Sequence, residues 1–187
     1  QHVTIPYDES YNAALSTADV YTGEYSVEVL AQFDAAIGGK GVYAGNIDDA
    51  HSATKGIGLF YTSSANGVYL RDGSQTLTAT SSDNTTFGSS LWTHIVATYD
   101  GTTLKYYVNG VLKASATGSG HTSWASQNFL VAKSTDSSSG SSVSYYFDGK
   151  FDELAIYNNA LSAAEVLENY YVINMKEVPV YDYLWGN

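Results

Sequence analysis

The stretch from Leu91 to Ala114 constrains the fold of this chain more than any other segment. It reads LWTHIVATYDGTTLKYYVNGVLKA, with runs of β-branched and aromatic residues separated by Asp100-Gly101 and Asn109-Gly110. Tight hairpin turns prefer Asp-Gly and Asn-Gly, because their central residues must take positive φ angles. The spacing of the two dipeptides therefore predicts a three-stranded antiparallel meander.

Short alternating runs on both sides of this meander predict further strands. The clearest is Tyr25–Phe33, in which Val27 and Val29 share one face while Glu28 lies on the other, which we expect to be solvated. The remaining predicted strands are His2–Pro6, Gly41–Gly45, Gly56–Thr62, Gly67–Asp72, Gln75–Thr80, Gln127–Lys133 and Tyr145–Tyr157. The polar tract Ser134–Ser142 is predicted to be a surface loop. About ten short strands at this spacing indicate an all-β, two-sheet antiparallel sandwich.

One short helix is predicted near the C-terminal end. Ser162 and Glu165 have the spacing of a capping box, and an apolar stripe follows, made of Val166, Leu167, Tyr170 and Tyr171. We therefore expect one domain over residues 1–171 and an extended, aromatic tail over 172–187.

Charge and composition exclude several classes of function. Eight basic against nineteen acidic residues give a net charge of −11, which repels nucleic acid and anionic lipid. No apolar run approaches the ~20 residues that a membrane span requires, so membrane insertion is not expected. Without cysteine the chain has neither disulfides nor thiolate metal sites. The seventeen tyrosines suit either half-exposed strands or an adhesive surface.

Two segments carry a resemblance to a known family. WTHIVATYDGTTLKYYVNG (92–110) and DGKFDELAIYNNALSAAEVLENYY (148–171) resemble the middle and closing signatures of laminin-G-like, concanavalin A-like lectin-glucanase domains. The opening HVTIP and the later YSVEVLAQF are similar to the first two strands of that family. The resemblance covers residues 2–171 and implies a jelly-roll sandwich. The strand that usually precedes HVTIP is missing, and the tail lies outside the pattern.

Catalysis is not expected. Hydrolases on this sandwich place two carboxylates at alternate positions of one strand. The nearest match here is Glu24 with Glu28, which has no intervening acid. The four histidines lack zinc-binding spacing, and His94 is expected to be a hydrogen-bonded structural residue.

The resemblance also implies a possible structural Ca²⁺ site at Asp152, with Asp8 and Glu9 as further oxygen donors. Calcium takes six to eight oxygen ligands, so carboxylates from both ends of the chain suit it. The alternative is that Asp152 caps a strand end or pairs with a lysine.

Ligand-binding candidates are exposed aromatic and planar polar side chains, because these contact the C–H faces and hydroxyls of sugars. Trp124 and His121 lie in the polar segment SGHTSWASQN and lead this set, although Trp124 alternatively anchors its own loop. Weaker candidates are Tyr69, Arg71, Asp83, Asn84, Asp136 and Tyr145.

These features predict a non-catalytic carbohydrate-binding or adhesion module. The alternative is a structural assembly subunit, either a virion decoration, capsid or fibre protein or a surface-filament component. Its assembly contacts would include Val180, Tyr183, Leu184 and Trp185. The expected partner is a glycan or a protein of a cell surface or virion, with homo-oligomerisation possible. A start at Gln1 without methionine suggests an exported, processed protein, on the extracellular side of a cell or on a virion exterior.

Overall fold

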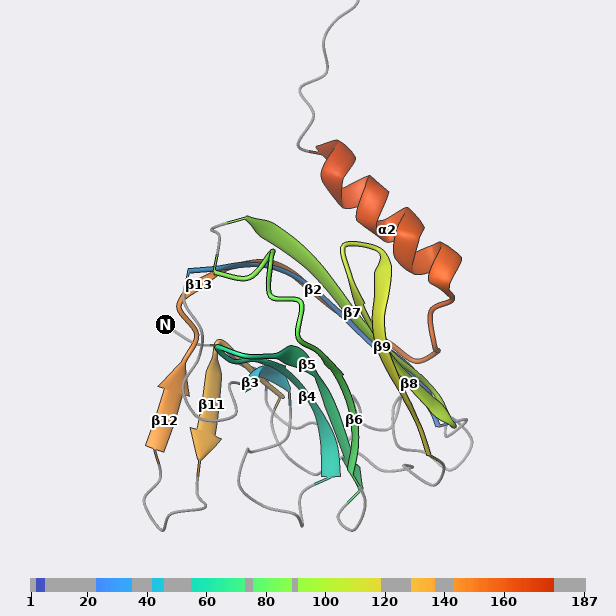
Figure 1. The fold of residues 1–187 in the computed structure, drawn as a ribbon, viewed down its shortest axis with the longest axis horizontal. Coiled ribbons are helices and arrows are strands. Elements are labelled where there is room, and N and C mark those ends of the chain that lie inside the picture. Colours follow the sequence, from blue (N-terminus) through green and yellow to red (C-terminus); the bar gives the residue numbers. More distant parts are fainter. Residues whose placement is uncertain are drawn as a thin grey trace, which may run out of the picture.

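The computed structural model describes residues 3–5, 23–34, 42–45, 55–72, 76–88, 91–118, 129–136 and 143–176. In these parts the chain forms two antiparallel sheets packed face to face, with a helix outside the pair (Figure 1). The predicted all-β sandwich with a helix near its C-terminal end is confirmed. No described helix is long and apolar enough to cross a membrane.

Six strands form what we call the front sheet. In spatial order they are β1 (Val3–Ile5), β10 (Phe129–Val131), β3 (Val42–Gly45), β4 (Lys55–Tyr61), β5 (Asn66–Asp72) and β6 (Thr76–Ser81). A separate hairpin of β11 (Lys133–Asp136) and β12 (Val143–Tyr146) follows β10. The amide of Ala132, just before β11, donates a 2.8 Å hydrogen bond to the carbonyl of Tyr43, which holds the hairpin beside β3.

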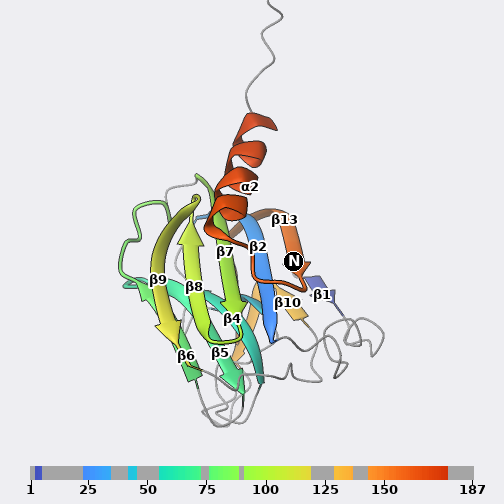
Figure 2. The same ribbon diagram turned by 90° about the vertical axis from the view of Figure 1, so that its right-hand side faces the viewer.

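Five strands form the back sheet, and Figure 2 shows them side by side. Their order is β13 (Gly149–Tyr157), β2 (Glu24–Phe33), β7 (Trp92–Asp100), β8 (Thr103–Val108) and β9 (Val111–Thr117). The predicted meander is therefore β7–β8–β9. At its second turn Asn109 and Gly110 have φ angles of 51° and 76°, the conformation for which Asn-Gly is selected.

Aromatic side chains fill the space between the sheets. The ring of Phe33 lies at the centre, with centroid distances of 4.7–5.4 Å to the rings of Tyr43, Tyr61, Phe87 and Phe147. Tyr25, Tyr99 and Tyr106 are also buried in this core. Many of the tyrosines are thus used for packing rather than for an outer surface.

The helix α2 (Ala163–Lys176) begins with the predicted capping box. The Ser162 amide donates to Glu165 Oε2 at 2.7 Å, and the Glu165 amide donates to Ser162 Oγ at 3.3 Å. The helix continues to Lys176, so the expectation of an extended chain from residue 172 is wrong for 172–176. Residues 177–187, with Val180, Tyr183, Leu184 and Trp185, lie outside the described residues.

Two predicted boundaries also differ from the structure. Tyr145–Tyr157 was expected to be one strand but forms β12 and β13, separated by Phe147 and Asp148. The predicted loop Ser134–Ser142 is wrong for residues 134–136, because 133–136 pair with β12, and residues 137–142 lie outside the described part of the chain. Polarity predicted a loop there, but hairpin pairing does not require apolar side chains.

The helix packs against the outer face of the back sheet (Figure 2). Val166 of α2 and Leu161 before it form a small buried cluster with Val96 and Tyr107 of β7 and β8. The buried Ser26 Oγ accepts from the Leu161 amide at 2.8 Å and donates to the Asn159 carbonyl at 2.9 Å. The outer face of β2 is therefore covered rather than solvated, which corrects the expectation for Glu28.

Candidate functional site

The outer face of the front sheet brings together two of the predicted ligand-binding residues, Tyr69 and Arg71. Both belong to β5 and are two residues apart, so they share a face. The Arg71 guanidinium carbon lies 5.6 Å from the centre of the Tyr69 ring. On its neighbour strand β4, Phe60 stacks on Tyr69 with a centroid distance of 4.3 Å and an interplanar angle of 20°. Phe60 was not predicted as part of a site.

Glycines opposite the two rings make room for this stack. Gly67 pairs with Phe60 and Gly58 pairs with Tyr69. A Cβ at Gly67 would lie 3.0 Å from Phe60 ring atoms and 2.3 Å from the Ala79 carbonyl, so the ring rests directly over the glycine. The alternation of glycine and aromatic residues in β4 and β5 is a sequence signal for such stacking, but the register of the two strands decides which rings meet.

Strand β6 adds exposed hydroxyl groups to the same face. Thr76, Thr78 and Thr80 pair with Arg71, Tyr69 and Gly67 respectively, and all three threonines are exposed. Paired residues point to the same side of a sheet. The outer face of β5 and β6 therefore combines the half-buried ring of Tyr69 and a row of exposed hydroxyls with the buried side chains of Phe60 and Arg71. We call Phe60, Tyr69, Arg71, Thr76, Thr78 and Thr80 the front-face cluster.

Asn84 and Asp83 lie at the other end of these strands and have internal partners. Asn84 Oδ1 accepts from Asn66 Nδ2 at 2.7 Å, and its Nδ2 donates to the Thr62 carbonyl at 3.2 Å. These bonds tie the β4–β5 turn to the segment after β6. The Asp83 carboxylate accepts from Lys113 Nζ at 2.8 Å, and this bond with the contacts of Thr85 lowers the pKa of Asp83 to about 2.

Asp136 and Tyr145 both belong to the β11–β12 hairpin, where Asp136 pairs with Val143 and Tyr145 with Ser134. Figure 1 shows this hairpin at the side of the front sheet. Their side chains, and His121 and Trp124 altogether, lie outside the described residues.

Asp152 lies at an irregularity in β13. The pairing with β2 shifts register between Phe151 and Glu153, which leaves Asp152 without a pairing partner in the ladder. Its side chain is exposed. Asp8 and Glu9 lie outside the described residues, and the described part of the chain holds no cluster of three or more metal-binding side chains.

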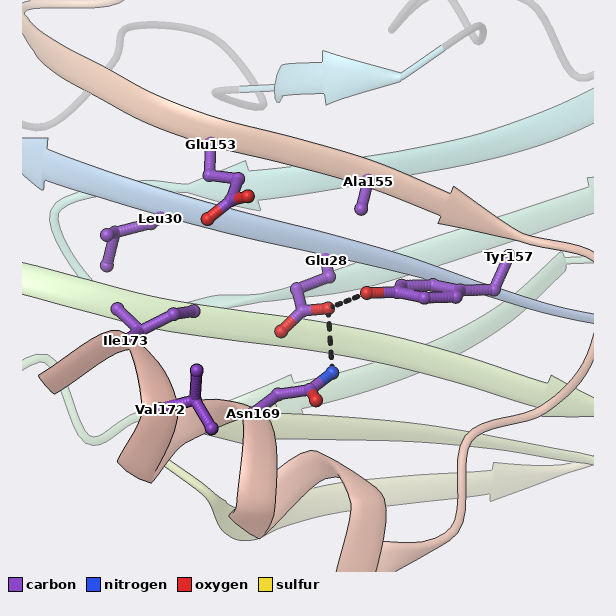
Figure 3. A pocket seen from close by; sticks show the side chains of 8 residues that line it. All are labelled: Glu28, Leu30, Glu153, Ala155, Tyr157, Asn169, Val172 and Ile173. Atoms are coloured by element: carbon purple, nitrogen blue, oxygen red, sulfur yellow. Dashed lines mark hydrogen bonds between the residues drawn. The ribbon is translucent and has the colours of Figure 1, made fainter. Parts of the chain in front are cut away.

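The back sheet contains a polar network that sequence reasoning missed. The carboxylate of Glu28 is 5% exposed and accepts three hydrogen bonds. The donors are His94 Nε2 at 2.6 Å, Tyr157 hydroxyl at 2.5 Å and Asn169 Nδ2 at 3.0 Å (Figure 3). His94 is 1% exposed and its ring stacks on Tyr170 of α2. The prediction that His94 is a hydrogen-bonded structural residue is confirmed.

These contacts keep Glu28 ionised. Burial alone would raise the pKa of Glu28, but the bonds from His94, Tyr157 and Asn169 outweigh it, and the pKa lies below its usual value. Burial and the bond to Glu28 raise the pKa of Tyr157, which stays protonated. Nδ1 of His94 is buried without a partner among the described residues, so the ring joins the network through Nε2 alone.

A pocket of about 140 Å³ opens beside this network, between α2 and the back sheet (Figure 3). Strands β2 and β13 form its floor, and α2 forms one wall. It is lined by Glu28, Leu30, Glu153, Ala155, Tyr157, Asn169, Val172 and Ile173. The lining thus contains two carboxylates, one hydroxyl, one amide and four aliphatic side chains.

Comparison with known proteins identifies the family. A laminin G model of the concanavalin A-like lectin/glucanases superfamily matches residues 8–167. The chain belongs to this superfamily. The meander and the β13–α2 segment that suggested a laminin-G-like domain both lie within the match, apart from the last turns of α2. The search of curated proteins found no match to the sequence of this chain.

Solved structures share its jelly-roll fold. Domain 4 of AbnA, a GH43 extracellular arabinanase from Geobacillus stearothermophilus, in complex with arabinotriose, has a TM-score of 0.59 and 21% identity. That match covers 78% of this chain and 65% of the arabinanase domain, slightly under two thirds of it. The CBM40 of the Ruminococcus gnavus IT-sialidase, bound to α2,3 sialyllactose, has a TM-score of 0.62, 16% identity, and coverages of 91% and 96%.

A third example is the heptameric SAP-like pentraxin of Limulus polyphemus. Its TM-score is 0.55 at 15% identity, and the match covers 77% of this chain and 68% of the pentraxin. At these identities the likeness shows the fold and not the ligand. The question of function therefore rests on the two outer faces of the sandwich.

Proposed function

We propose that this chain is a non-catalytic carbohydrate-binding module that acts outside the cell and binds glycan on the outer face of its front sheet. The observation that carries the proposal is the front-face cluster. It supplies the half-buried ring of Tyr69, with the Arg71 guanidinium packed against it, and exposed hydroxyls of β6. Aromatic rings and hydroxyls are groups that contact sugar C–H faces and hydroxyls.

The structural neighbours support a glycan as the ligand. Two of them, domain 4 of the arabinanase and the CBM40 of the sialidase, are in complex with arabinotriose and sialyllactose respectively. Trp124 and His121 are proposed to complete the binding surface, together with Asp136 and Tyr145. Asn84 is proposed to hold the neighbouring turn in place rather than to contact the glycan, because its amide already bonds to Asn66 and Thr62.

The chemistry of Glu28 argues against hydrolysis. A general acid or base must exchange a proton near the working pH, whereas the Glu28 carboxylate accepts three donors and has a lowered pKa. Its neighbour Tyr157 has a raised pKa. We infer that the Glu28 and Glu153 pair is not a glycosidase centre.

The test is an array of neutral and acidic oligosaccharides followed by titration calorimetry of any hit. Tyr69→Ala should weaken binding about tenfold or more, since sugar stacking on an aromatic ring is lost. Tyr171→Ala removes an exposed tyrosine from α2 on the opposite side and should leave the affinity unchanged. Equal affinities of the two variants, or no hit on the array, would reject the proposal. Trp124→Ala tests the second part of the surface.

A structural Ca²⁺ held by Asp152, Asp8 and Glu9 is an additional proposal. Its support is the exposed carboxylate of Asp152 at the β13 irregularity. EDTA should lower the melting temperature and Ca²⁺ should restore it. A melting temperature that changes neither with EDTA nor with Ca²⁺ would exclude this calcium site.

Exposed apolar side chains favour a second candidate function, assembly into a larger structure. They include Leu91 just before β7, Val111 and Leu112 at the start of β9, and Leu167, Tyr171 and Val172 of α2. Val180, Tyr183, Leu184 and Trp185 would extend such a contact. Sedimentation velocity of the full chain and of a chain ending at Lys176 tests it. If both are monomeric up to high concentration, the assembly function is excluded.

A further inference from the structure

The pocket between α2 and the back sheet has a defined chemistry that glycan binding on the front sheet does not use. We propose that it binds a primary ammonium group on an aliphatic stem, such as a lysine side chain or a small free alkylamine. The site lies on the opposite sheet from the front-face cluster, so the two proposals stand or fall independently.

The floor of the pocket provides fixed negative charge. Glu28 and Glu153 lie on neighbouring strands at diagonal positions, because Glu28 pairs with Ala155 and Glu153 with Leu30. Paired residues of a sheet point to the same side, and Figure 3 shows both carboxylates on the helix side of the sheet. The eight lining residues include no lysine or arginine. The charge of the two acids is therefore not neutralised by a basic side chain within the lining.

The two carboxylates differ in a way that suits a cation rather than a proton. Glu28 is held rigidly by His94, Tyr157 and Asn169, and its pKa is lowered. Its Oε2 accepts two of these bonds and its Oε1 only one, so Oε1 retains a free lone pair. Glu153 is exposed and able to adjust to a ligand. One fixed and one adjustable acceptor match the three donors of an ammonium group.

The walls are aliphatic and the mouth is open. Leu30, Ala155, Val172 and Ile173 provide apolar contact for a methylene stem. Ala155 lies directly opposite Glu28 and carries only a methyl group, which leaves space beside the carboxylate. Val172 is 50% exposed at the opening, so a ligand can enter from solvent. A volume of about 140 Å³ accommodates a four-carbon stem.

The arrangement disfavours the other cations. A guanidinium group is wide and planar and prefers bidentate contact with one carboxylate. Glu28 cannot offer that contact, because its Oε2 already accepts two bonds, which leaves only the exposed Glu153 for it. Calcium requires six to eight oxygens, and half of the lining here is hydrocarbon. An alkylammonium ion uses both the acidic floor and the apolar walls.

The test is a titration of the full chain with n-butylammonium and with Nα-acetyl-lysine amide. Binding is monitored by the methyl NMR signals of Val172 and Ile173. We expect saturable shifts of these signals with the charged probes and none with n-butanol, which has a stem of the same length without the charge. Tight binding of the lysine derivative identifies a protein side chain as the source. Binding of butylammonium alone identifies a free amine.

Three variants locate the binding. Glu153→Gln should raise the dissociation constant about tenfold, since it removes one charged acceptor. Val172→Trp should block the mouth and abolish the shifts. Glu168→Gln removes an exposed acid of α2 that does not line the pocket and should change nothing.

Equal shifts with n-butanol, displacement of the amine by millimolar Ca²⁺, or unchanged binding in both Glu153→Gln and Val172→Trp would overturn the proposal. Absence of any shift up to high millimolar probe would overturn it as well. None of these results bears on glycan binding at Tyr69.

Discussion

The two outer faces of this sandwich show how one fold produces two different surfaces. The outer face of the front sheet carries glycines, threonines and a stacked aromatic pair, and its polar groups on β6 face solvent. The outer face of the back sheet lies under α2, where Ser26, Glu28 and His94 are buried and bonded. The same alternating strand pattern thus gives the proposed binding surface on the front sheet and a buried polar network where α2 covers the back sheet.

The two outer faces differ in how much stability a mutation should cost. A buried carboxylate is stable only when its hydrogen bonds are complete, so each partner of Glu28 is needed. Exposed threonines on β6 lose little when they are truncated. Mutations on the back sheet should therefore change mainly stability, and those on the front sheet mainly binding.

The largest expected effect is that of Glu28→Gln. The neutral amide retains the shape of the side chain but cannot accept from His94, Tyr157 and Asn169 at once, because its NH₂ group is itself a donor. We expect a loss of about 2–4 kcal/mol in the free energy of unfolding, measured in urea. Glu168→Gln, an exposed change on α2, should stay within about 0.5 kcal/mol. Similar losses in both variants would contradict the structural role of the network.

Acid should reduce the advantage of the wild type over Glu28→Gln. The folded pKa of Glu28 lies below its usual value of 4.5, so ionisation stabilises the fold above about pH 4.5. That contribution is lost as the pH falls through the folded pKa. Asp83, Asp100 and Glu165 also have lowered pKa values and add to the loss in both proteins. Parallel stability curves from pH 7 to pH 3 would show that Glu28 does not titrate as described.

A smaller effect is expected at the turn that touches α2. Gly110 and Gly23 have similar positive φ angles of 76° and 70°, so alanine strains both by about 1–2 kcal/mol. At Gly110 the new Cβ would also lie 2.8 Å from Leu167 Cδ1, whereas at Gly23 the nearest atom is at an ordinary 3.6 Å. Gly110→Ala should therefore cost about 1 kcal/mol more than Gly23→Ala in the same urea assay. An equal cost would mean that α2 shifts away without penalty.

The smallest change in stability is expected for Thr78→Ala. This threonine is exposed beside Tyr69, so the unfolding free energy should change by less than about 0.5 kcal/mol. Binding of any glycan identified on the array should nevertheless weaken measurably, because one hydroxyl of the front-face cluster is lost. Unchanged affinity would place the ligand elsewhere on the front sheet.

Part of the candidate site was predictable from sequence. Tyr69 and Arg71 are an aromatic and a charged residue two positions apart in one predicted strand. Side chains alternate between the two faces of a strand, so the sequence already places both on one face. Phe60 was missed because its stacking on Tyr69 depends on the register between β4 and β5, which brings Gly58 opposite Tyr69. That register is a property of the sheet and not of either strand alone.

The sequence by itself determined the local features: the meander, the Asn109-Gly110 turn and the capping box at Ser162. Each follows from backbone preferences and hydrogen bonds within a few residues, and each is present in the structure. Only the tertiary structure decided which sheet face α2 covers. Glu28, Tyr157 and Asn169 are up to 141 residues apart, and nothing local shows that a strand acid and a helix amide will meet. The burial of Glu28 and the pocket beside it arise from that long-range packing.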